Sequence, residues 1–105
     1  MGMAEPIPLK MSDAAMLRIV RRLAQDSCNV FLTPHAKKRM SKRKISLPQV
    51  LACLRNGVIV EPVHLTIQGN WKCTMQYRWA GDEVSVAAAL HRHDDGEWIA
   101  VVTVF

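Results

Sequence analysis

The segment from residue 71 to residue 79 follows the strictest pattern in this chain. Apolar and polar side chains alternate there without a break: Trp71, Lys72, Cys73, Thr74, Met75, Gln76, Tyr77, Arg78, Trp79. Successive side chains of a β-strand point to opposite faces, so this period of two predicts a strand with one apolar face and one polar, basic face. We expect the helices of the N-terminal half to pack on the apolar side.

The rest of the C-terminal half also reads as strands. Residues 58–63 are rich in β-branched side chains, but Pro62 restricts this strand to a sheet edge or a bulge. Residues 83–91 alternate two sets of small and apolar side chains, and residues 98–105 are apolar on both faces except at Thr103, which is typical of a strand inside a sheet. Turns are predicted at 68–70, 80–82 and 94–96. Together these segments predict a four-stranded antiparallel sheet.

The N-terminal half carries three helix start signals. Ser12, Thr33 and Ser46 are good capping residues, and Pro34 and Pro48 lie in the first turn after two of them. The predicted helices cover about 12–26, 34–43 and 47–56, with a short strand at 29–32 that enters or flanks the sheet. The predicted fold class is therefore α+β.

Length and composition limit the class of protein. The 105 residues fit one domain, predicted at 12–105, preceded by a flexible arm at 1–11 that contains two prolines and no periodic pattern. The three cysteines are odd in number and widely spaced, which favours neither disulfides nor a zinc site. Without a secretory signal or an apolar run of ~20 residues, we expect a cytoplasmic protein with no membrane contact.

Positive charge is concentrated in the helical half. Ten basic residues and one acid lie between Arg18 and Arg55, whereas three basic residues and six acids follow from Asn56 onward. This asymmetry favours a polyanionic partner such as nucleic acid, or an acidic protein. A basic face that only keeps the protein in solution explains the same composition.

The predicted helix at 34–43 is the first candidate site. On a helix His35 and Arg39 lie about 40° apart, Lys42 falls about 20° to the other side, and Arg43 borders the same stripe. Histidine transfers protons near neutral pH, whereas arginine and lysine bind phosphate and stabilise developing negative charge. Metal-free RNA cleavage needs these groups. The alternatives are a solvated helix face and a His35 that bonds a backbone carbonyl.

Further candidates lie on the strands. The residues predicted to contact RNA are Lys38, Lys42, Lys72, Arg78 and His91. His91 and His93 leave one face of a strand as a metal-binding pair would, but no carboxylate or cysteine at ligand spacing supports a metal site, so no metal or other cofactor is expected. Tyr77 and the three tryptophans are predicted to belong to the core more than to a base-stacking surface, with exposure of Trp71, which lies beside a turn, as the alternative.

The chain resembles a known family from about residue 30 to its C-terminus. The pattern His-Ala-x-x-Arg-Met-x-x-Arg-x-Ile falls on His35, Ala36, Arg39, Met40, Arg43 and Ile45. This pattern resembles that of a bacterial domain-of-unknown-function family, number 4258. That family in turn resembles RelE- and BrnT-like toxins, of the barnase–EndoU–colicin–RelE type of fold. The resemblance implies a RelE-like domain with helices packed on one face of a four- to five-stranded antiparallel sheet and one extra N-terminal helix.

The same resemblance implies a function. It points to a toxin-like, metal-independent endoribonuclease of a toxin–antitoxin-type system that acts on mRNA, either free or ribosome-associated, and that binds an antitoxin protein. The family pattern singles out His35, Arg39 and Arg43 as catalytic residues, whereas the terminal Val104 and Phe105 offer no polar catalytic tail. The alternative is a non-catalytic basic binding module for nucleic acid or an acidic protein, such as a phage or plasmid accessory protein. The sequence does not indicate an oligomeric state.

Overall fold

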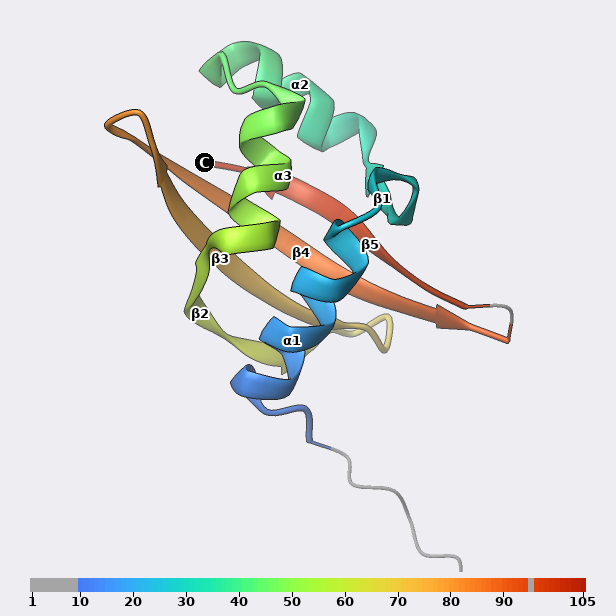
Figure 1. Cartoon of the computed structure of the whole chain (residues 1–105). Coiled ribbons are helices and arrows are strands. Elements are labelled where there is room, and N and C mark those ends of the chain that lie inside the picture. Colours follow the sequence, from blue (N-terminus) through green and yellow to red (C-terminus); the bar gives the residue numbers. More distant parts are fainter. Residues whose placement is uncertain (1–9, 95) are drawn as a thin grey trace, which may run out of the picture.

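The computed structural model describes residues 10–94 and 96–105. Residues 1–9 of the predicted arm, and Asp95 of the predicted 94–96 turn, lie outside the described residues. The elements follow one another as α1 (Asp13–Ala24), the short 3-10 helix η1 (Ser27–Asn29), β1 (Val30–Leu32), α2 (Pro34–Arg43), α3 (Leu47–Asn56), β2 (Val58–Leu65), β3 (Trp71–Trp79), β4 (Asp82–His93) and β5 (Gly96–Val104). Within the described residues the protein is thus α+β, with three α-helices and one five-stranded sheet (Figure 1).

The predicted helix starts are confirmed. The side chains of Ser12 and Thr33 each accept a hydrogen bond from a backbone N–H of the first turn, and Ser46 forms a reciprocal capping box with Gln49. These bonds satisfy N–H groups that have no partner inside a helix. Helix α1 ends at Ala24, slightly before the predicted Asp26, because the chain there turns into the 3-10 helix.

The sheet has the order β1-β5-β4-β3-β2, and the prediction that it is antiparallel throughout is wrong. Strands β2 to β5 pair antiparallel in sequence, but β1 pairs parallel with β5, so the sheet is mixed. Short turns force neighbouring strands to run antiparallel, whereas a long connection leaves the direction free. Two helices and three strands separate β1 from β5, and their relative direction could not be inferred from a turn.

Two predicted strand positions are confirmed: the last strand lies inside the sheet, and the strand that contains Pro62 lies at its edge. Strand β5 lies inside, between β1 and β4, whereas β2 is an edge strand with two register shifts. The backbone N–H of Val63 on this edge donates to the Asp13 carboxylate at 2.9 Å, so α1 occupies one of the groups that a further strand would use.

The helices cover one face of the sheet, and the core lies between them (Figure 1). The largest fully buried side chains come from both layers: Met16, Val20, Val50, Leu54, Met75, Val84, Val86, Ile99, Val101 and Val104. Cys73 and Met75 are fully buried, which confirms the apolar face predicted for β3. Each such side chain stabilises the fold by roughly 1.5–3 kcal/mol through burial. Within the described residues, no helix is both long and apolar enough to span a membrane.

The aromatic residues only partly follow the prediction that they belong to the core. Trp71 and Tyr77 pack against the core while remaining partly exposed, and Trp79 is 38% exposed at the end of β3. For Trp98 the prediction is wrong. It precedes the buried Ile99, so alternation along β5 turns its ring to the face that the helices leave open, where it contacts His91.

Candidate nucleic-acid interface

The open face is the side of the sheet opposite the helices. Cross-strand pairing aligns one row of its residues from edge to edge: Phe31, Ala100, Ala89, Lys72 and His64. The two alanines at the centre of the row are shorter than their neighbours, so the surface is lowest there. Ala89 is 6% exposed and Ala100 is 5% exposed, although no described helix covers this face.

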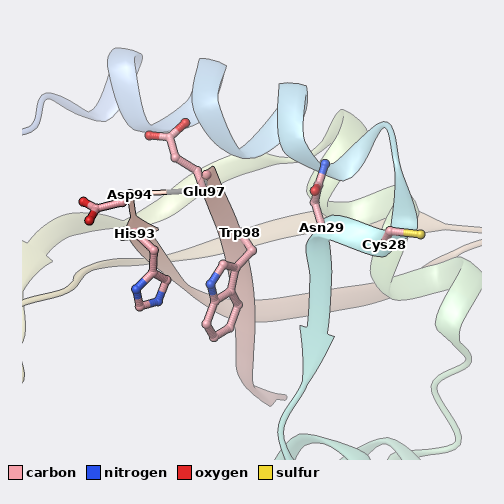
Figure 2. Close-up of a pocket in the computed structure, with 7 residues that line it drawn as sticks. Cys28, Asn29, His93, Asp94, Glu97 and Trp98 are labelled. Atoms are coloured by element: carbon pink, nitrogen blue, oxygen red, sulfur yellow. The ribbon is translucent and has the colours of Figure 1, made fainter.

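Aromatic rings gather at one end of the open face. The imidazole of His91 and the indole of Trp98 are stacked, with ring centroids 4.1 Å apart and planes inclined by 10°. His93 lies nearly parallel to Trp98 at 6.1 Å, and Phe31 meets Trp98 edge-on at 6.0 Å. Figure 2 shows the rings of His93 and Trp98 on one side of the β4–β5 hairpin, whereas Glu97 points to the other side, toward α1.

A groove of about 260 Å³ crosses the open face beside these rings. Its floor contains Ala89 and Ala100, and His91 and Lys72 contribute the groups that can carry charge. The turn after β2 closes one end through Thr66, Gln68 and Asn70, while Thr33 and Val102 line the other side. The structure therefore brings together two predicted site residues, His91 and Lys72, from neighbouring strands.

The protonation of His91 follows from its surroundings. Burial lowers the pKa of His91 below its ordinary value of 6.5, and the neighbouring His93 lowers it further. The imidazole is therefore neutral at pH 7 and can accept a proton. Lys72 forms no ion pair with any described residue, so its ammonium group is free to meet an anion.

A second cavity, of about 640 Å³, shares none of its lining residues with the groove (Figure 2). His93 and Trp98 line it together with Cys28, Asn29 and the carboxylates of Asp94 and Glu97. Glu97 accepts hydrogen bonds from Arg22 at 2.8 Å and Arg92 at 2.7 Å, and these arginines lower its pKa. Asp94 forms no ion pair with any described residue, and its carboxylate makes this cavity a poorer place for a polyanion than the groove.

The residues predicted on the helix do not share one cavity. His35 is exposed on α2, and Arg39 is half-buried with its Nε donating to the carbonyl oxygen of Val104 at 3.3 Å. Arg43 lines a third cavity, of about 320 Å³, whose walls include Lys44, Asp82 and Glu83. Neither His35 nor Arg39 lines any of the three cavities described here. Arg39 therefore attaches α2 to the end of β5.

The remaining predicted contacts are spread over the surface. Lys38 and Lys42 are exposed on α2, and Arg78 lies near the end of β3, 3.9 Å from Glu83 and away from the groove. Their contact with RNA stays a prediction. Among the described residues, no group of three His, Cys, Asp or Glu side chains is placed to hold a metal ion.

Sequence reasoning missed the partners of His91 in this interface. In the structure His93 pairs with Gly96 and His91 with Trp98, whereas counting outward from the predicted turn at 94–96 pairs His93 with Glu97, so the predicted turn places the register one residue off. The sequence did contain a signal for the floor, because the alanines at 87–89 leave two small side chains on one face of a strand and one on the other. No sequence signal indicated that Asn70 and Thr66 line the groove, since their position depends on how the turn folds over the sheet.

Fold and groove define the class as a small α+β protein whose mixed sheet is covered by helices on one face and carries a basic, aromatic groove on the other. More specifically, the chain belongs to the family described as Domain of unknown function (DUF4258), whose model matches residues 32–105. The matched part contains α2 and all of the residues that line the groove, and it leaves out α1. The predicted membership is confirmed. No curated protein and no solved structure matches the chain.

Proposed function

We propose that this protein is a toxin-like, metal-independent endoribonuclease that cleaves mRNA in the groove of the open face. The observation that carries the proposal is the presence of His91 and Lys72 in the same groove. A group that accepts a proton at neutral pH and a fixed cation are the minimum for this reaction.

The chemistry follows from these two side chains. The neutral imidazole of His91 takes the proton of the 2′-hydroxyl, and the 2′-oxygen then forms a bond to the adjacent phosphorus. Lys72 stabilises the negative charge on the phosphorane. The bond from phosphorus to the 5′-oxygen breaks, and that oxygen takes up a proton from solvent water, to which His91 then returns the proton that it took. The products are a 2′,3′-cyclic phosphate and a free 5′-hydroxyl, and neither a metal nor an oxidant takes part.

The basic helix supports the proposal from outside the groove. Thr33, which lines the groove, also caps α2, so the exposed Lys38, Lys42 and Arg43 extend the positive surface away from that end. Such cations raise the association rate and the affinity for RNA without reading its sequence. The RelE-like resemblance is the reason to expect mRNA as the substrate and an antitoxin as the regulating partner.

A cleavage assay in EDTA tests the proposal. We expect His91→Gln to lower the cleavage rate of a labelled mRNA fragment by 10²-fold or more, the usual contribution of a proton-transfer group, while RNA binding falls far less. Lys72→Ala should lower both. His35→Gln is the matched control, because this histidine lies on the exposed face of α2 and outside the groove. Loss of cleavage in His35→Gln with normal His91→Gln would move the active site to α2.

A non-catalytic RNA-binding module is the second candidate. Among the described residues that line the groove, His91 alone titrates near neutral pH, and no second such group stands ready to protonate the leaving oxygen. An RNA that binds with the salt dependence of several phosphate contacts but stays intact in EDTA would favour this candidate. Growth arrest with new mRNA cuts on expression in bacteria would favour the nuclease.

A further inference from the structure

We propose that the groove is the binding site for one unpaired nucleobase, which stacks on His91, so that the substrate class is single-stranded RNA. The inference rests on the proposed function for the identity of the polymer as RNA. The site itself rests on the shape, the stacking surface and the charges of the groove.

The shape of the groove suits a single flat ring. Its volume of about 260 Å³ is comparable to one nucleoside, and its floor is formed by the side chains of Ala89 and Ala100, which are direct cross-strand partners. Two methyl groups side by side let an aromatic ring approach the sheet closely. A larger side chain at either position would occupy the space of the ring.

The wall of the groove is a stacking surface. The ring of His91 lines the groove, and Trp98 lies against it at 4.1 Å with planes inclined by 10°. Trp98 lines the neighbouring cavity and not the groove, so it supports the histidine ring from the side away from the groove. A base that enters the groove continues this stack, and stacking of this kind accepts any base because every base has a π-face.

The end of the groove offers hydrogen bonds to the edge of a base. The Nδ2 of Asn70 donates to the carbonyl oxygen of Leu90 at 3.3 Å, which fixes the amide and leaves its Oδ1 as a free acceptor open to solvent among the described residues. The hydroxyl of Thr66 accepts from the Asn70 backbone N–H at 3.2 Å and keeps its own hydrogen to donate. A base in a duplex already uses its pairing edge, so an unpaired base fits these groups better.

Charge complementarity agrees with a nucleotide in this place. Lys72 is the cross-strand partner of Ala89, so its ammonium group stands beside the floor where a phosphate attached to the bound base would lie. No described carboxylate lines the groove. An anion on the ribose therefore meets a cation, and the base meets an apolar and aromatic surface.

Two alanine-to-leucine variants of the full chain test the site. Ala89→Leu fills the floor of the groove, whereas Ala87→Leu places the same side chain two residues along the same strand, on the same face and outside the groove. We expect wild-type protein to bind adenosine 5′-monophosphate, with NMR shifts at Ala89, Ala100 and His91. Ala89→Leu should weaken this binding at least tenfold and Trp98→Ala about tenfold, while Ala87→Leu binds as wild type. Thermal midpoints show that each variant is folded.

A competition assay tests the substrate class. A single-stranded RNA should bind at least tenfold more tightly than the same strand annealed to its complement, and Ala89→Leu should remove the difference. Equal affinity for the two forms, or adenosine 5′-monophosphate binding that Ala89→Leu leaves unchanged, overturns the inference. Base binding without RNA cleavage supports this site and refutes the nuclease, whereas cleavage by a protein that binds no base refutes this site alone.

Discussion

Gly57 lies where the end of α3 meets strand β3, and replacing it with alanine tests how tightly the helical layer is set on the sheet. A Cβ at this position would lie 2.5 Å from the carbonyl oxygen of Cys53 and 2.6 Å from that of Gln76. Real Cβ atoms essentially never come closer than 3.0 Å to such atoms, so the backbone at the end of α3 must shift by several tenths of an ångström, both within the last helical turn and relative to β3. Both obstacles are backbone atoms, and neither can rotate away.

The cost can be worked out from these contacts. Gly57 has φ of −75°, which any residue adopts, so the penalty is one of space alone. Overpacking of this kind costs about 1–3 kcal/mol. The separation also disturbs two hydrogen bonds of 2.8 Å, from the Gly57 N–H to Cys53 and from Arg21 to the Gly57 carbonyl, which adds about 1 kcal/mol. The total of about 2–4 kcal/mol corresponds to a fall in Tm of roughly 10 to 25 °C.

Thermal and urea unfolding followed by circular dichroism measure this loss. The matched control is Gly69→Ala, because Gly69 has nothing within 4 Å of its Cβ position but a φ of +90°. That change should cost about 1 kcal/mol through the backbone conformation alone. If Gly57→Ala proves as mild as Gly69→Ala, α3 does not pack on β3 as closely as described.

Three further predictions concern titratable groups. Burial raises the pKa of the Cys53 and Cys73 thiols to about 12, so a thiol reagent at pH 8 should modify only the exposed Cys28 in folded protein and all three cysteines in urea; fast reaction of a second thiol contradicts the packing. The bond from Arg22 holds the pKa of Glu97 below its ordinary 4.5, and such a carboxyl contributes stability above that pH and loses it as the pH falls. Glu97→Gln should therefore lower the free energy of unfolding by about 0.5–1 kcal/mol at pH 7. Urea unfolding at acid pH should show no difference between this variant and the wild type. NMR titration should place the pKa of His91 below 6.5, so that protonation destabilises the fold as the pH drops through this value; a pKa above 6.5 would refute the described surroundings of the ring.

Local signals in the sequence were sufficient for the helices and for most of the strands. Ser12, Thr33 and Ser46 begin helices because a side-chain oxygen satisfies N–H groups within three residues, and that interaction needs no distant partner. The alternation from Trp71 to Trp79 likewise encodes its own two faces. The family pattern centred on His35 identified the family correctly for the same reason, since it is a property of neighbouring residues.

The candidate site depended on partners that the sequence keeps apart. The basic residues of α2 indicated His35, Arg39 and Arg43 as one site. The fold separates these side chains, and Arg39 donates a hydrogen bond to the end of β5. His91 and Lys72 were both identified as RNA-contacting candidates. Their meeting in one groove required the pairing of β3 with β4, which brings Lys72 opposite Ala89.

The sequence by itself determined that this chain has three capped helices, a strand at 71–79 with one apolar face, and a basic N-terminal half, because each depends on residues within a few positions of one another. Only the tertiary structure decided that β1 runs parallel to β5 and that Trp98 leaves the core to stack on His91. The segment 83–91 has small or apolar side chains on both faces, so its pattern alone does not say which face is buried. The helices settle that choice by covering Val84, Val86, Ala88 and Leu90, and the face they leave open becomes the groove.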